Sequence, residues 1–144
     1  MSPSSTTIAD LLREARTIAV VGFSPNPARD SHEVAAYLQA HGYRIIPINP
    51  ACAGSIQLGE HCYPSLSQAA KALHEAGLTI DIVDCFRRSE HIDAIAEEAI
   101  AIGARALWMQ LGIVNAAAAT KAGKAGLQVI MDRCIKIDHA HMLH

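Results

Sequence analysis

Short apolar runs alternate with amphipathic stretches along the whole chain. The runs are apolar at nearly every position, which is typical of strands that are buried on both faces of a sheet. Strands that alternate with helices predict βαβ crossovers, and therefore an α/β fold with a doubly wound, parallel, five-stranded sheet and helices on both faces. The expected strands are residues 17–21, 43–48, 80–85, 105–109 and 127–131.

The helices are expected where apolar residues recur at three- and four-residue spacing. Capping patterns mark the starts of several expected helices, and a glycine stands at the end of most of them. Asp30 with Glu33 is a candidate capping box, as is the segment Ser65–Gln68. The expected helices run over residues 8–15, from Asp30 or Ser31 to Gly42, from Ser65 to Ala76, from Ser89 to Gly103, and from Asn115 to Ala125.

The remaining segments complete a single domain over residues 1–144. Its first 16 residues carry the N-terminal helix, and residues 132–144 form a tail with a final short turn of helix. Residues 51–64 are the longest irregular connection. The 144 residues, 51% of them hydrophobic, are enough for one substantial core. Because only 4% are aromatic, this core must consist mainly of aliphatic side chains.

Charge and targeting signals exclude several classes of protein. The net charge is -2 and no long basic run is present, so we expect neither a nucleic-acid surface nor a membrane-binding one. No signal peptide or bilayer-spanning run is found. The four cysteines show no CxxC pair, which fits reduced thiols in a soluble cytoplasmic protein.

The segment after the first strand carries the strongest functional signal. Gly22 follows a buried strand and precedes a helix, the arrangement that offers backbone N–H groups to phosphate in nucleotide-binding α/β domains. The second and third glycines of the fingerprint G-x-G-x-x-G are missing. Ser24 can donate a hydroxyl and Arg29 can grip phosphate. The sequence therefore indicates a phosphate-bearing ligand other than an ordinary nicotinamide cofactor.

In such sheets ligands bind at the carboxyl ends of the strands. Those ends are rich in polar and cationic side chains, and the second strand ends in Asn49, where a nicotinamide enzyme would have an acid that binds ribose. A cationic contact to a 2′-phosphate would still permit an NAD(P)-dependent oxidoreductase. The candidate ligand-binding residues are Gly22, Phe23, Ser24, Pro25, Arg29, Asn49, Pro50, Phe86, Arg87, Gln110 and Gly112.

At these residues the chain resembles the small stand-alone coenzyme A-binding proteins, whose Rossmann-like fold is similar to the N-terminal domain of the succinyl-CoA synthetase alpha subunit. The matching segments occur in the same order over about residues 17–141. They include residues 20–25, 43–50, 81–87, 108–112 and 131–136.

The resemblance implies that coenzyme A (CoA) or an acyl-CoA is the ligand. It implies that Gly22, Phe23 and Ser24 line the pyrophosphate with help from Arg29. It further implies that Asn49 and Pro50 flank the adenosine, that Phe86 and Arg87 frame the third-strand side, and that Gln110 and Gly112 lie near the pantetheine arm.

No catalytic or metal-binding residue is predicted. Cys134 is the best candidate nucleophile, but an inert thiol at a strand end is the more common situation. The spacing of Cys52, His61 and Cys62 matches no common zinc signature. We therefore expect a binding protein rather than an enzyme. A CoA-binding subunit that completes an acyl-CoA synthetase with a separate ligase chain, or a homo-oligomer, remains an alternative.

Overall fold

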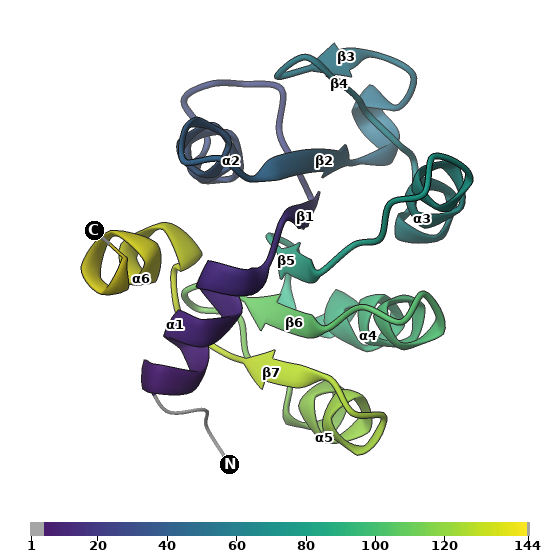
Figure 1. Cartoon of the computed structure of the whole chain (residues 1–144). Coiled ribbons are helices and arrows are strands. Elements are labelled where there is room, and N and C mark those ends of the chain that lie inside the picture. Colours follow the sequence, from purple (N-terminus) through teal and green to yellow (C-terminus); the bar gives the residue numbers. More distant parts are fainter. Residues whose placement is uncertain (1–4, 144) are drawn as a thin grey trace.

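The computed structural model describes residues 5–143, and the side chains of residues 7–143. Five parallel strands form one sheet in the order β2-β1-β5-β6-β7 (Figure 1). The predicted fold class is therefore confirmed. The strands are β1 (Thr17–Val21), β2 (Arg44–Ile48), β5 (Ile82–Cys85), β6 (Ala106–Met109) and β7 (Gln128–Ile130).

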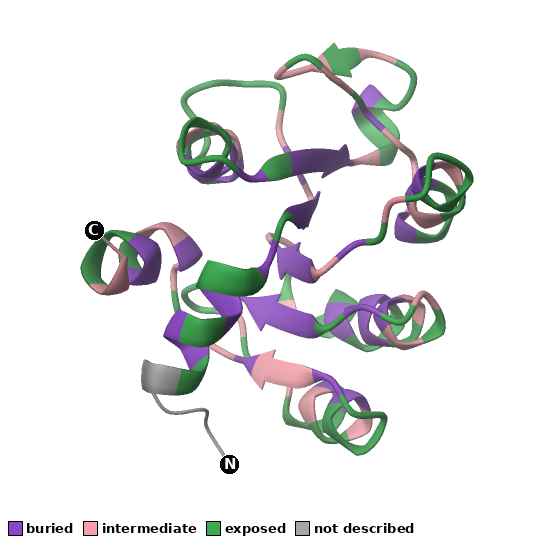
Figure 2. Ribbon diagram, in the orientation of Figure 1, coloured by how far each residue is buried: buried purple, intermediate pink, exposed green. Residues whose placement is uncertain are grey.

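Helices cover both faces of the sheet, and each face has its own apolar core (Figures 1 and 2). One face carries α1 (Ser5–Glu14), α2 (Asp30–Ala40) and α6 (Ile135–Met142), which pack around the fully buried Trp108. The other face carries α3 (Leu66–Glu75), α4 (Ile92–Ala101) and α5 (Ala116–Lys124). None of the described helices is long and apolar enough to cross a membrane.

The long connection after β2 is more ordered than the sequence suggested. A 3-10 turn, η1 (Pro50–Cys52), leads into a short hairpin of β3 (Ile56–Gln57) and β4 (Glu60–His61). Its turn residues Leu58 and Gly59 both have positive φ, at 52° and 75°. Two-residue strands are too short to give a periodic signal, so the sequence pattern could not reveal them.

The predicted caps of α3 and α5 are confirmed. Ser65 Oγ accepts a hydrogen bond from Gln68 N, and Asn115 Oδ1 accepts one from Ala118 N. The predicted capping box of α2 is wrong, because Arg29 occupies the cap position without a side-chain cap.

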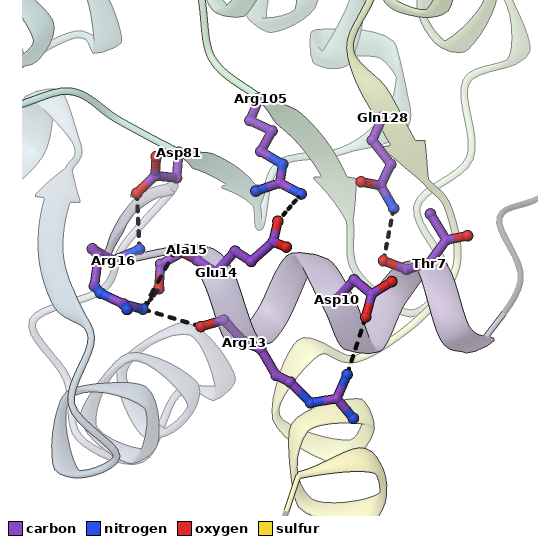
Figure 3. Close-up of polar contacts among 9 residues, drawn as sticks. All are labelled: Thr7, Asp10, Arg13, Glu14, Ala15, Arg16, Asp81, Arg105 and Gln128. Atoms are coloured by element: carbon purple, nitrogen blue, oxygen red, sulfur yellow. Dashed lines mark hydrogen bonds and ion pairs between the residues drawn. The ribbon is translucent and has the colours of Figure 1, made fainter.

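Helix α1 is tied to the amino ends of the strands (Figure 3). Arg105 forms an ion pair with Glu14 at 2.5 Å, and Gln128 Nε2 donates to the carbonyl of Thr7. Asp81 accepts hydrogen bonds from the backbone N–H groups of Arg16 and Thr17. These contacts occupy the edge of the sheet opposite the predicted ligand site.

The C-terminal helix is longer than the expected short turn. α6 spans eight residues, and a two-pronged ion pair joins Arg133 to Asp138, with N–O distances of 2.7 and 2.9 Å. A further hydrogen bond runs from Trp108 Nε1 to the carbonyl of Arg133 at 2.7 Å. The segment leading into α6 is thereby fixed to β6.

Candidate functional site

The strand order reverses between β1 and β5, because the chain leaves β1 toward β2 on one side and later returns to β5 on the other. Such a reversal is where ligands bind in open α/β sheets. Gly22 follows β1 at this point and Phe86 follows β5, with Phe86 N donating to Val21 O at 2.8 Å. The sequence had placed the phosphate-binding segment at this position.

A pocket of about 350 Å³ opens at this point of the fold. It lies between the end of the sheet and the start of α2, and its volume is in the lower range of small-molecule sites. The residues that line it are Gly22, Ser24, Ala28, Arg29, Asp30, Ser31 and Phe86. A wider hollow of about 1030 Å³ along β7 holds none of the predicted site residues.

Several backbone N–H groups predicted to face phosphate are already used within the protein. Gly22 N and Phe23 N both donate to the carbonyl of Ile48, at 2.9 and 3.2 Å, and Ser24 N donates to Ser31 Oγ at 2.9 Å. The Phe23 side chain is fully buried and stacks near His32, with ring centroids 5.3 Å apart. The exposed Pro25 has no N–H to offer.

The backbone N–H groups that remain free lie further along the chain, at the start of α2. Asp30 N and Ser31 N, in the first turn of α2, donate to no acceptor among residues 5–143. Ser31 is the second residue of α2 and its Oγ accepts from Ser24 N, while Arg29 at the cap position makes no side-chain cap. An uncapped helix N-terminus attracts anions through its N–H groups and its dipole. Asp30 and Ser31 are not among the residues predicted to bind the ligand, since a Ser beside an Asp suggests a capped helix.

The two predicted arginines carry unmatched positive charge. Neither Arg29 nor Arg87 forms an ion pair within the described part of the chain, whereas the exposed Arg88 lies 3.7 Å from Glu90. Arg29 lines the pocket, and Arg87 lies against Gly22. The Arg29 guanidinium and the free N–H donors of the same pocket form a cradle suited to phosphate, and Arg87 adds a second positive charge next to Gly22.

One carboxylate borders this cradle. The exposed Asp30 lines the pocket at the start of α2. The sequence predicts Asp30 as part of a capping box and not as a charge beside the ligand. The positive charges of Arg29 and Arg87, together with the positive end of the α2 dipole, outweigh the single negative charge of Asp30.

The amide of Asn49 braces the loops around the site. Its Nδ2 donates to Phe23 O at 2.7 Å, and its Oδ1 accepts from Ala51 N at 2.9 Å. Pro50 follows in η1 and is exposed. Neither residue lines the pocket, so a contact of this segment with adenosine stays a prediction.

Gln110 and Gly112 follow β6 and also lie outside the pocket lining. Gln110 is buried, and its Oε1 accepts from Ile135 N at 3.2 Å at the start of α6. Gly112 N donates to Asp132 Oδ1 at 2.7 Å. The structure thus gives both residues a role in holding the loops after β6 and β7, and their predicted place near pantetheine stays untested.

No cluster of three or more potential metal ligands occurs in the described part of the chain. Cys134, the candidate nucleophile, is a half-buried residue at the start of α6. Asp84 lies fully buried in β5, and neither of its carboxyl oxygens has a hydrogen-bond partner among the described residues. Burial raises the pKa of Asp84 well above its usual value, because an apolar surrounding disfavours the ionised carboxylate.

Known proteins resemble this chain over nearly its whole length. An uncharacterised protein of Bacillus subtilis, YneT, is 40% identical over 139 residues, which is 96% of both chains. A hypothetical protein from Pyrococcus horikoshii has a solved structure with a TM-score of 0.87 and 34% identity, covering 99% of this chain and 94% of that one. The solved structure of a protein from Thermus thermophilus has a TM-score of 0.85 and 29% identity. The match covers 98% of this chain and 100% of that one.

The fold extends to more distant proteins. RSP, a Rex-family repressor solved with NADH, has a TM-score of 0.55 at 16% identity, a likeness in fold alone. By contrast, residues 16–140 match the family described as the CoA binding domain. This match includes the whole sheet and the pocket at its switch point, and the chain therefore belongs to the CoA-binding domain family.

Proposed function

We propose that this protein binds coenzyme A or an acyl-CoA at the carboxyl ends of the strands, with its phosphates at the start of α2. The observation that carries the proposal is that Arg29, which forms no ion pair within residues 7–143, lines the same pocket as Asp30 and Ser31, whose backbone N–H groups are free. Membership of the CoA-binding domain family supports the choice of ligand.

The chemistry of the ligand fits this charge pattern. Coenzyme A carries a pyrophosphate and a ribose 3′-phosphate, and each can accept charge-assisted hydrogen bonds from arginine. The end of β2 carries the neutral Asn49, so no carboxylate at that position repels the ribose phosphate. The pocket volume of about 350 Å³ accommodates a phosphate-bearing part of the molecule, and the remainder would extend along the sheet edge past Asn49 or Gln110.

The proposed role is that of a carrier or sensor. The pocket lining contains no cysteine or histidine, and its one carboxylate, Asp30, is exposed at a helix start. Such a set can bind and orient phosphates but offers no buried nucleophile or general base beside them.

Calorimetric titration of the full chain with coenzyme A, dephospho-coenzyme A and NAD tests the proposal. We expect coenzyme A to bind most tightly and the ligand without the 3′-phosphate to bind more weakly. Equal binding of all three ligands, or no binding, would refute it. Binding of NAD without coenzyme A would instead favour a dinucleotide-dependent enzyme.

A further inference from the structure

Two buried cysteines lie side by side in the connection that follows β2. Cys52 ends η1 and Cys62 follows β4, and their Sγ atoms are 2.8 Å apart. Both thiols are free, with Cys52 9% exposed and Cys62 fully buried. This contact joins residues ten positions apart, and nothing in the proposed ligand-binding role accounts for it.

The backbone holds the two residues in this position. Gly54 N donates to Cys62 O and Cys62 N donates to Ser55 O, both at 2.9 Å, while Ser55 N donates to Cys52 O at 3.1 Å. A disulfide bond is about 2.05 Å long, so the sulfur atoms need to approach by only about 0.8 Å. The segment is therefore preorganised for a bond between these two residues.

The other two cysteines have no such neighbour among the described residues. Cys85 is buried in β5, where its sulfur donates to Val83 O, and Cys134 is half-buried at the start of α6. No sulfur–sulfur contact involves either of them in residues 7–143. The structure thus singles out one pair from the four cysteines.

We propose that Cys52 and Cys62 form a reversible intramolecular disulfide, which makes the segment from Cys52 to Cys62 a redox-sensitive element beside the ligand site. In a cytosolic protein, disulfides are chiefly catalytic or redox-sensing. The pair lies directly behind Asn49, since Cys62 Sγ is 3.6 Å from Asn49 O and Cys52 N donates to that same oxygen at 3.2 Å.

The oxidant is an organic disulfide such as oxidised glutathione. The Cys52 thiolate attacks one of its sulfurs, the glutathione disulfide bond breaks, and one glutathione thiolate leaves. Cys62 then loses its proton and attacks the Cys52 sulfur of the mixed disulfide, which releases the second glutathione. Two protein thiols are oxidised by two electrons in all, and their protons end on two glutathione thiols.

The order of these steps follows from burial. Cys52 is the more exposed of the two residues. Burial and the neighbouring Cys52 raise the pKa of Cys62 to about 12, so Cys62 is rarely a thiolate near neutral pH. Cys52 is therefore the entry point and Cys62 the resolving residue, and we expect slow oxidation to a stable product.

The test is to equilibrate the full chain in glutathione buffers from fully reduced to fully oxidised, quench with acid, and alkylate the remaining thiols under denaturing conditions. Intact mass and a non-reducing digest are then measured. We expect two of the four cysteines to lose reactivity together, with the Cys52 and Cys62 peptides linked and released by reductant. Closing the loop is also expected to raise Tm by about 5 °C.

Matched variants sharpen the result. Cys134→Ser should oxidise as the wild type does, whereas Cys52→Ala should abolish the link. Cys62→Ala should stop at a glutathione adduct on Cys52. The proposal is overturned if all four cysteines stay alkylatable in the most oxidising buffer, or if a different pair is linked. Peptide mapping of the wild type decides the matter even where an alanine variant folds poorly.

Discussion

Gly22 and Phe86 approach each other so closely that no side chain fits between them. A Cβ built on Gly22 would lie 2.8 Å from the carbonyl oxygen of Phe86 and 2.9 Å from Cδ of Arg87. Gly22 also has a φ of 87°, in the left-handed region. The glycine thus lets the loops after β1 and β5 meet at the floor of the pocket.

Gly22→Ala is expected to destabilise the fold by about 2–4 kcal/mol, because it combines backbone strain with a steric clash. Gly54→Ala is the matched control, since Gly54 has a φ of 88° and open space around the position of a Cβ. Urea unfolding of the two variants separates strain from clash. Equal losses in both would show that the close approach to Phe86 contributes nothing.

Arg29→Ala should weaken coenzyme A binding by about 1.5–3 kcal/mol, the range for a hydrogen bond to a charged group. Arg88→Ala is the control, because Arg88 is exposed and lies beside Glu90 outside the pocket. Calorimetric titration of both variants gives the comparison. If Arg29→Ala binds as well as Arg88→Ala does, Arg29 faces solvent in the complex.

Removing the carboxylate at the pocket rim should act in the opposite direction. Asp30→Asn takes away the one negative side chain of the pocket lining, so coenzyme A should bind more tightly, by up to about 1 kcal/mol. The gain should shrink as salt is raised from 50 to 500 mM. Asp10→Asn, an exposed substitution on α1, is the control and should not change the affinity. Weaker binding by Asp30→Asn would mean that this carboxylate contacts the ligand favourably.

Gln110→Leu should destabilise the protein by about 1–3 kcal/mol, because it leaves the buried N–H of Ile135 without its acceptor. Gln68→Leu is the control, since the Gln68 side chain is exposed on α3. Thermal unfolding measures the loss, and amide exchange at α6 locates it. A variant that keeps its stability but loses coenzyme A affinity would instead place Gln110 at the ligand.

Asp84 makes stability depend on pH. The folded protein holds a proton on this carboxyl to well above the pH at which an unfolded Asp releases it, near 3.9. Between those two values the native state binds more protons, so Asp84 lowers stability as pH rises, by about 1.4 kcal/mol per pH unit. Asp84→Asn cannot ionise, and its stability relative to wild type should therefore increase with pH above 4.

Urea unfolding of wild type and Asp84→Asn at pH 4.5, 6 and 7.5 measures this difference. Asp10→Asn again serves as control, because its carboxylate is exposed beside Arg13 and should show no comparable trend. A constant difference between Asp84→Asn and wild type across this pH range would show that Asp84 is ionised in the fold.

The secondary structure followed from local features that the sequence displays. The strand at residues 17–21 was predicted with its observed bounds, since a short run that is apolar after its first residue, Thr17, suits a strand buried on both faces. Ser65 and Asn115 were recognised as caps because capping is a local interaction. The cap side chain accepts a hydrogen bond from the backbone N–H only three residues further on. The capping box of α2 failed because the helix already begins at Asp30, which puts Arg29 at the cap position and Asp30 inside the first turn.

By itself, then, the sequence determined the α/β class, the order of elements and the edge of the sheet at which we propose that the ligand binds, because periodicity and turn chemistry are local. Only the tertiary structure decided which donors are free there, since Ile48 takes the N–H groups of Gly22 and Phe23 and leaves those of Asp30 and Ser31. It likewise decided that Asp84 is buried with no hydrogen-bond partner in residues 7–143, and that Cys52 and Cys62 are in contact. Such pairings depend on distances between segments far apart in the chain, and no local pattern encodes them.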